Sequence, residues 1–251
     1  TIRLLLPYAT QIADEITGWL MEAKFVKRAD ALGSVRRKAS TVGDVDIACA
    51  TNYPKLAIEH FTKYPKASRV LEKGERTAGI VVAGGRQVDL MVETPDAYGA
   101  LLQHFTGSKH HNIAIREYAL KKGYSVSDYG IKPLRGKAQN VKLKSQKYNE
   151  KLKIYDIPTE EKLYEILGMQ WIPPELREGT GEINAALNHN LPKLVELSDI
   201  KADLQIHSDF DIETSHDVGE SSMQDLVVKA NELGYEYIAF TEHNPSRGKH
   251  N

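Results

Sequence analysis

The sequence has very little cysteine: Cys49 is the single one among 251 residues. One cysteine cannot form an internal disulfide, which excludes the small disulfide-stabilised folds of secreted proteins. The sequence also shows neither a long apolar run nor a charged-then-apolar leader, the features that direct membrane insertion and secretion. We therefore expect a cytoplasmic protein with no membrane partner.

An excess of charge of one sign is absent as well. Lys and Arg number 33 and Asp and Glu number 34, which gives a formal net charge of -1. Balanced charge provides no global attraction to nucleic acid, so any basic surface has to be local. The hydrophobic fraction of 41% allows a sizeable core, and the length predicts about two compact units. Because Thr1 is not a methionine and Asn251 follows an expected strand end, we expect a piece of a longer protein.

The first 93 residues have the pattern of an α+β domain. Apolar residues recur at helical spacing over residues 6–23 and 53–64. Runs rich in β-forming residues, separated by glycine-containing turns, predict strands. Helices combined with such a run of strands indicate an α+β sheet domain. The expected strands are residues 25–32, 44–50, 68–73, 77–83 and 87–93.

A second, helical or mixed lobe is expected over residues 94–197. Pro95 is well placed at a first helical turn, and helical spacing recurs over residues 112–122 and 159–167. Thr159 has the residue type of a helix N-cap.

A third segment, residues 198–251, changes pattern again. It reads strand, helix, strand over residues 202–207, 222–233 and 235–241, which predicts the start of a βαβ unit.

One segment is strongly basic. Residues 132–153 hold eight Lys or Arg and one acid, Glu150. Such a segment can bind DNA phosphates by releasing counterions, or it can be a solvated linker rich in charge. Both interpretations stay open.

Three aspartates carry the chemistry that the sequence predicts. Asp44 and Asp46 are two residues apart on an expected strand, so both carboxylates project from one face. Asp89 lies in a similar strand setting among Val88, Leu90 and other β-forming residues. Three carboxylates at one edge suit Mg²⁺ or Mn²⁺, and two such ions can stabilise an in-line phosphoryl displacement.

A turn that can hold phosphate precedes these acids. Gly33 permits close backbone approach, Ser34 offers a hydroxyl and amides at a helix start, and Arg37 adds a charged contact. Each signal is weak alone. The spacing of Gly-Ser, then Asp-x-Asp ten residues later, then a lone Asp in an apolar strand is far more specific, and it indicates a site for a metal-bound nucleoside triphosphate.

At these residues the sequence resembles the nucleotidyltransferase superfamily and, within it, the bacterial branch of the family X DNA polymerases, related to polymerase beta. The resemblance covers almost the whole chain. It implies a nucleotidyltransferase palm with a mixed sheet over residues 1–93 and a thumb over residues 94–197. It also implies that Asp44, Asp46 and Asp89 are catalytic and bind the metal, and that Gly33, Ser34, Arg37 and Gly43 form the triphosphate-binding turn.

The same resemblance extends into the second lobe. His104-Phe105-Thr106-Gly107-Ser108 is similar to the family's Tyr-Phe-Thr-Gly-Ser element, which shapes the nucleotide sugar pocket, and Asn112 and Arg116 match positions that approach the incoming base and the template strand. His104 departs from the tyrosine of the vertebrate enzymes, and Gln87 stands where those enzymes have an arginine near the primer terminus.

Residues 198–251 resemble the opening of a PHP domain, a metal-dependent phosphoesterase fold. Asp203 to Ser208 and Phe240 to His243 look like its first two motifs, with Gln205 where the first motif has a metal-binding histidine. The resemblance leaves His207, Asp217 and His243 as possible ligands of a divalent metal. We expect no phosphoesterase or exonuclease activity from this remnant.

The resemblance therefore implies a DNA-directed DNA polymerase that adds deoxynucleoside triphosphates (dNTPs) to a primer 3′-hydroxyl by two-metal phosphoryl transfer. Gapped or primed DNA is the expected partner, in DNA repair, near the bacterial nucleoid. Two alternatives stay open: another nucleotidyltransferase that acts on RNA or a small molecule, and a DNA-binding fragment with little activity. The sequence does not fix the oligomeric state.

Overall fold

The computed structural model describes residues 3–134, 148–149, 154–210 and 218–243 of the chain. The chain divides into two compact units, Thr1–Leu191 and Pro192–Asn251, which are described separately. Within the described ranges, none of the helices has the length and the apolar character that crossing a membrane requires.

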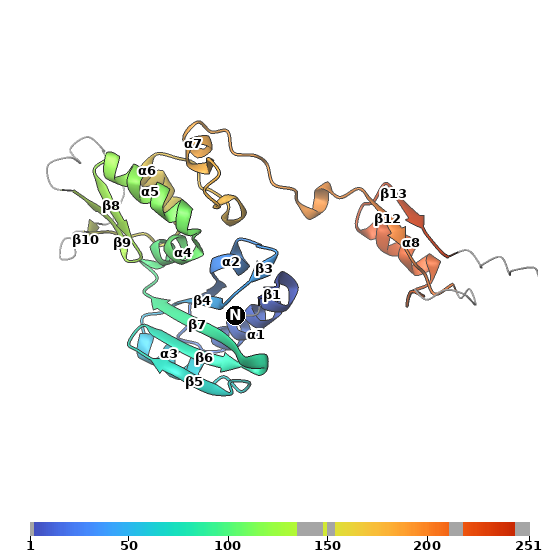
Figure 1. The fold of residues 1–251 in the computed structure, drawn as a ribbon, viewed down its shortest axis with the longest axis horizontal. Helices are drawn as coiled ribbons and strands as arrows, with labels where there is room; N and C mark the ends of the chain where they lie inside the picture. Colours follow the sequence, from blue (N-terminus) through green and yellow to red (C-terminus); the bar gives the residue numbers. More distant parts are fainter. Residues whose placement is uncertain (1–2, 135–147, 150–153, 211–217, 244–251) are drawn as a thin grey trace, which may run out of the picture. The chain divides into compact units, whose positions relative to one another are not determined.

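The first unit is built on a five-stranded mixed sheet. Strands β4 and β7 are parallel, and the other neighbours are antiparallel. Figure 1 shows β4, β7, β6 and β5 side by side in that order. Across the sheet the order is β2 (Arg28–Ala31), β4 (Val45–Ala50), β7 (Arg86–Glu93), β6 (Thr77–Val82) and β5 (Arg69–Lys73).

The two faces of this sheet pack against different helices, because side chains alternate between faces along each strand. Ile47 and Cys49 join the larger core with α1 (Leu6–Met21) and α3 (Pro54–Thr62). Ala48 and Ala50 point the other way, into a smaller core with α4 (Tyr98–Thr106).

Two short elements lie between β2 and β4. The single turn α2 (Gly33–Arg36) follows β2, and β3 (Thr41–Val42) pairs antiparallel with β1 (Leu4–Leu5) at the beginning of the chain.

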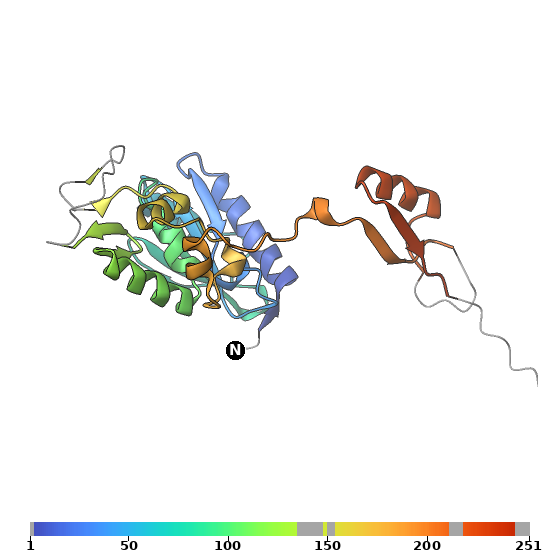
Figure 2. The same cartoon turned by 90° about the horizontal axis from the view of Figure 1, so that it is seen from above.

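The rest of the first unit surrounds a third core. Helix α5 (Lys109–Lys121) runs beside the hairpin of β8 (Tyr124–Ser127) and β9 (Gly130–Pro133), as both views show (Figures 1 and 2). Tyr124, Leu163 and Ile172 are among the buried residues of this core. The remaining elements are β10 (Tyr148–Asn149), β11 (Ile154–Tyr155), α6 (Glu160–Leu167), the 3-10 turn η2 (Pro174–Leu176) and α7 (Glu182–Leu187).

The second unit contains one βαβ arrangement. After the 3-10 turn η3 (Leu197–Asp199), β12 (Ala202–Ile206) and β13 (Tyr237–Phe240) pair in parallel, with α8 (Met223–Glu232) between them in the chain. This confirms the predicted strand, helix and strand.

The predicted α+β class and mixed sheet are confirmed, and several details are corrected. The strand expected at 25–32 begins only at Arg28, because the Val26 amide closes a turn onto Ala23. Pro95 is not in a helix, since residues 94–97 form a turn and α4 begins at Tyr98. The hairpin of β8 and β9 was not predicted, because each strand has only four residues. The domain boundaries at residues 93 and 197 stay predictions.

Thr159 is at the N-cap position of α6, as its residue type predicts, but its side chain makes no capping hydrogen bond. The first turn of α6 contains Glu160 and Glu161, whose negative charges suit a helix N-terminus without a hydroxyl cap. The backbone of Thr159 is instead packed against α4. A Cβ at Gly99 would lie 2.2 Å from the Thr159 carbonyl carbon, and the Gly99 amide donates to Ile157 O at 2.8 Å.

Replacing Gly99 by alanine should therefore destabilise the fold by about 1–3 kcal/mol, the usual effect of overpacking, since backbone atoms cannot move aside cheaply. Gly18→Ala is the matched control: Gly18 is inside α1 with nothing within 4 Å of the added carbon, so helix propensity should stabilise that variant by up to ~1 kcal/mol. Urea unfolding of both variants measures the difference. Equal stability of the two would contradict the close packing of α4 on Thr159.

Candidate active site

The strand pair β4 and β7 brings two acids of the predicted site side by side. Asp46 lies directly opposite Asp89 in the parallel register, and aligned residues of neighbouring strands project from the same face. That face also carries Ala48, which packs against α4. Asp44 lies one residue before β4 begins, a correction to the strand expected at 44–50.

Two glycines leave room for these carboxylates. A Cβ at Gly33 would lie 2.8 Å from Asp46 Oδ2, and a Cβ at Gly79 would lie 2.8 Å from Asp89 Oδ1. Gly33 also has a φ of +54°, a left-handed conformation that favours glycine. The predicted role of Gly33 in close approach thus has a spatial and a backbone basis, whereas Gly79 was not predicted.

Gln87 holds the carboxylate of Asp89. Its Nε2 donates to Asp89 Oδ1 at 3.0 Å and to Oδ2 at 2.9 Å. An amide donates hydrogen bonds without carrying a positive charge, so this contact orients the carboxylate without neutralising it. The departure noted at position 87 therefore places an uncharged partner on a candidate metal ligand.

Both carboxyl groups have raised pKa values. Burial is the main cause at Asp46, whose pKa rises to about 6, and the charges of Asp89 and Asp44 add to the effect. Burial also raises the pKa of Asp89, against the lowering effect of the Gln87 hydrogen bond, and Glu72 and Asp44 raise it further. A cation among these groups would remove the repulsion between them.

The donor set fits a hard divalent cation, because Asp46 and Asp89 offer carboxylate oxygens from adjacent strands and Mg²⁺ and Mn²⁺ take such ligands. Across the residues that the structure describes, however, no group of three His, Cys, Asp or Glu side chains is close enough to hold a metal ion. The predicted convergence of three carboxylates is thus not formed among these side chains. Mutual repulsion among Asp44, Asp46 and Asp89 opposes their closer approach.

The predicted phosphate-binding turn forms α2, and Arg37 extends from its end. Arg37 Nη1 donates to Thr106 O at 2.6 Å, and Nε donates to Glu178 Oε1 at 2.7 Å. Ser34 is half-buried inside the turn, and its backbone oxygen accepts a hydrogen bond from Ala39 N at 3.0 Å. Arg37 thereby connects α2 to the last residue of α4.

Gly43 lies next to a cation that was not predicted. A Cβ at Gly43 would be 3.5 Å from Arg3 Nη1, and Arg3 donates to the Thr41 hydroxyl at 2.8 Å and to Thr41 O at 2.6 Å. Arg3 is a lone basic residue before an apolar helix, and no motif in the sequence distinguishes it.

The end of α4 and the start of α5 gather the other predicted nucleotide-binding residues. Asn112 Nδ2 donates to His104 O at 2.6 Å, and Arg116 Nη2 lies 2.9 Å from His104 Nδ1. The His104 and Phe105 rings meet edge to face at 4.8 Å. A cavity of about 460 Å³ is lined by Arg37, His104, Phe105, Gly107, Asn112 and Arg116, among others.

The structure therefore brings six predicted residues into one cavity, while Gly33, Ser34, Gly43 and the three aspartates do not line it. Gly33 lies between the acids and the cavity, since a Cβ added at this residue would be 2.8 Å from Asp46 Oδ2 and 4.0 Å from Phe105 O. The acids and the cavity are thus neighbours.

A largely buried ionic network connects α2 to α4 and α6, and no sequence pattern predicted it. Arg36 donates two hydrogen bonds to Glu160, at 2.9 and 2.6 Å, and one to the Thr106 hydroxyl at 2.5 Å. Arg177 Nη1 donates to Glu160 Oε1 at 2.5 Å. Burial alone would raise the pKa of Glu160, but Arg177 and Arg36 offset it and lower the pKa to about 2.

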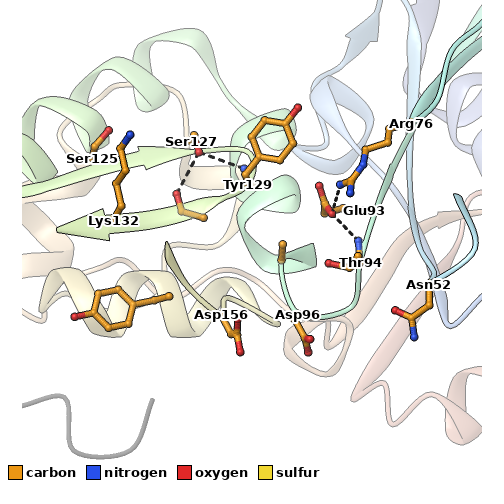
Figure 3. A pocket seen from close by; sticks show the side chains of 13 residues that line it. Asn52, Arg76, Glu93, Thr94, Asp96, Ser125, Ser127, Tyr129, Lys132 and Asp156 are labelled. Carbon is orange, nitrogen blue, oxygen red and sulfur yellow. Dashed lines mark hydrogen bonds and ion pairs between the residues drawn. The ribbon is translucent and has the colours of Figure 1, made fainter. Parts of the chain in front are cut away.

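A separate cavity of about 670 Å³ lies at the far end of β7. Figure 3 shows Arg76 beside Glu93, with Asp96, Lys132 and Asp156 also on its wall. Glu93 is four residues beyond Asp89, roughly 13 Å along the strand. These groups comprise three acids and two bases, so the cavity offers phosphate no net positive charge.

In the second unit, two of the three possible metal ligands lie together. The rings of His207 and His243 stack at 5.2 Å. Glu242 accepts hydrogen bonds from the Ser208 amide at 2.8 Å and from its hydroxyl at 2.6 Å, and its Oε2 lies 3.9 Å from His207 Nδ1. Asp217 lies outside the described residues, as does the greater part of the basic segment 132–153.

Comparison with known proteins gives relatives in one family. The family model for the DNA polymerase beta thumb matches residues 101–178. A curated relative, the DNA polymerase/3'-5' exonuclease PolX of Bacillus subtilis (strain 168), is 30% identical over 244 residues, which cover 96% of this chain. The chain spans 39% of that relative's length.

The fold is similar to a solved structure as well. A crystal structure of Leishmania infantum polymerase beta, a ternary P/T complex, matches with a TM-score of 0.57 and 21% identity, over 71% of this chain and 77% of that one. The thumb match and the Bacillus relative agree with the shared fold, so this chain is similar to the family X DNA polymerases.

Proposed function

We propose that this chain adds dNTPs to a primer 3′-hydroxyl under the direction of a template strand, as in gap filling during DNA repair. The observation that carries the proposal is the pairing of Asp46 with Asp89 across β4 and β7, beside the cavity lined by Arg37 and Asn112. Carboxylates next to a cationic pocket suit a metal-bound triphosphate.

Asp44, Asp46 and Asp89 are the residues that would hold Mg²⁺ or Mn²⁺. When bound, the cation lowers the pKa of an attacking hydroxyl and neutralises phosphate charge. Gln87 keeps Asp89 oriented, and Gly33 keeps the space beside Asp46 clear.

The other residues bind and position the substrate. Arg37 contacts the triphosphate together with Ser34 of α2, while Gly43 follows β3 and Arg3 adds positive charge beside it. Phe105 and His104 border the sugar and base from the cavity wall, and Asn112, held by its bond to His104 O, faces the incoming nucleotide. Arg116 contacts the template strand.

The proposed partners are gapped or primed DNA and a dNTP, in the cytoplasm of a bacterium. The relative from Bacillus subtilis supports the bacterial setting. The basic segment at residues 132–153 supplies a local positive charge for DNA phosphates.

Extension of a labelled primer across a one-nucleotide gap tests the proposal. Four substrates that differ only in the template base should each give addition of the complementary nucleotide, with Mg²⁺ or Mn²⁺ present and none after chelation. Template-independent addition, or addition only to an RNA end, would favour another nucleotidyltransferase. Salt-sensitive DNA binding with no addition would favour a DNA-binding fragment.

For the second unit we propose the opening of a PHP domain without phosphoesterase activity of its own. Glu242 is engaged by Ser208, which competes with its use as a metal ligand, and Gln205 replaces a histidine in the first motif. Metal-dependent release of nucleotides from a primer end by the purified chain would contradict this.

A further inference from the structure

The side chain of Glu178 is paired with Arg37, the arginine that contacts the triphosphate in the proposed function. Glu178 follows η2, and its Oε1 accepts the hydrogen bond from Arg37 Nε at 2.7 Å. Arg37 Nη1 is also engaged, by Thr106 O at 2.6 Å. Two of the three nitrogens of this guanidinium therefore already have acceptors, one of them an anion.

A carboxylate and a phosphate are ligands of the same kind for arginine, since both present oxygens to the planar fork of N–H donors. Arg37 lines the cavity in which the triphosphate is proposed to bind. A triphosphate that uses the Nε side of this guanidinium has to displace Glu178 first.

The neighbouring ion pair, Arg36–Glu160, is more buried than the Arg37–Glu178 pair. The two arginines are equally buried, at 16% exposed for Arg36 and 15% for Arg37, but their carboxylate partners differ: Glu160 is 3% exposed and shares two hydrogen bonds with Arg36, whereas Glu178 is 44% exposed. An anion at the surface can rotate into water at little cost, because exposed ion pairs contribute little free energy. The Arg37–Glu178 pair is thus exchangeable, and the Arg36–Glu160 pair is structural.

The backbone nevertheless holds Glu178 in place beside Arg37. The preceding residue, Arg177, is fully buried, and its carbonyl accepts the Ser108 amide at 2.9 Å. The Glu178 amide donates to Leu176 O at 3.0 Å. Only the side chain of Glu178 has to move for Arg37 to change partners.

We propose that Glu178 is an internal competitor of the nucleotide triphosphate at Arg37 and so sets the affinity for the nucleotide. This inference rests on the proposed function, in which Arg37 contacts the triphosphate. The pair keeps Arg37 oriented when no nucleotide is bound, and displacing it costs part of the binding free energy.

A double-mutant cycle tests the proposal. The dissociation constant of a non-hydrolysable dNTP analogue is measured on a gapped duplex with Mg²⁺ for the unchanged chain, Glu178→Gln, Arg37→Ala and the double variant. Glu178→Gln should lower the constant by about two- to fivefold, the range of an exposed ion pair. Arg37→Ala should raise it, and the double variant should behave like Arg37→Ala.

Glu175→Gln is the matched control, because it removes the same charge from an exposed position in the same segment and should leave the constant unchanged. Glu178→Ala, which also removes the accepting oxygen, should shift affinity in the same direction as Glu178→Gln, and thermal unfolding verifies that each variant folds.

The outcomes separate the two proposals. If Arg37→Ala weakens nucleotide binding but neither Glu178 variant tightens it, Glu178 does not compete with the triphosphate, and the substrate role of Arg37 stands. If Arg37→Ala leaves nucleotide binding unchanged, the proposed contact of Arg37 with the triphosphate is wrong, and so is the proposed competition by Glu178.

Discussion

Replacing Asp46 by asparagine should lower the rate of nucleotide addition by at least about a hundredfold, because stabilisation by the metal is worth several kcal/mol and an amide is a far weaker metal ligand than a carboxylate. Asp46 is central to the acid pair, since it lies opposite Asp89 and both Asp89 and Asp44 raise its pKa. Single-turnover extension of a gapped primer measures the rate, and Mn²⁺ titration by calorimetry measures the metal affinity.

Stability should move in the opposite direction in this variant. Asparagine has the same shape as aspartate but removes a partly buried charge that is repelled by Asp89 and Asp44, so the folded chain should be at least as stable as before. Asp14→Asn, at an exposed position of α1, is the control and should keep both rate and metal affinity. A rate for Asp46→Asn near that of the control would rule out the aspartate pair as the catalytic centre.

Replacing Glu160 by glutamine should destabilise the chain by about 3–5 kcal/mol, since it leaves two arginines without their shared carboxylate in a buried site. Arg177 is fully buried, and its Nη2 has no hydrogen-bond partner among the described residues even with Glu160 present. Urea unfolding at neutral pH measures the loss. Glu165→Gln is the control, because that residue lies in the same helix and forms an exposed ion pair with Lys162, which contributes at most ~1 kcal/mol.

The same network predicts a pH dependence. Arg177 and Arg36 lower the pKa of Glu160 from its usual 4.5 to about 2, so its ionised form is stabilised in the folded chain. This stabilisation is complete above pH 4.5 and is lost as the pH falls toward 2. Unfolding measured across this range should show a steeper loss of stability for the unchanged chain than for Glu160→Gln. Parallel curves would show that Glu160 is not held ionised.

The features of the candidate site that depend on local geometry could be predicted from the sequence. Alternation along a strand correctly gave the setting of Asp46 and Asp89, because side-chain direction follows from strand geometry alone. The direct opposition of these two residues depends on the register of β4 and β7, which no local pattern determines. The contact of Gln87 with Asp89 again follows from alternation, since residues two apart on a strand share a face.

The parts that escaped prediction depend on long separations or short elements. Arg36 and Glu160 are 124 residues apart, and neither belongs to a periodic pattern that would indicate a partner. Thr159 lies at the N-cap position that its residue type predicts, whereas no local pattern indicates the close packing of its backbone against Gly99.

The parallel pairing of β4 with β7 also determines the order in which the molecule can form. Strands β5, β6 and β7 are antiparallel neighbours along the chain and close short loops. Strand β4, in contrast, pairs with β7 across four intervening elements, which are α3, β5, β6 and the 3-10 turn η1 (Ala83–Gly85). Contacts between distant segments carry a larger loop-closure entropy and form more slowly. We therefore expect the two carboxylates to meet late in folding, so that during refolding the return of nucleotide addition lags behind the return of helical signal.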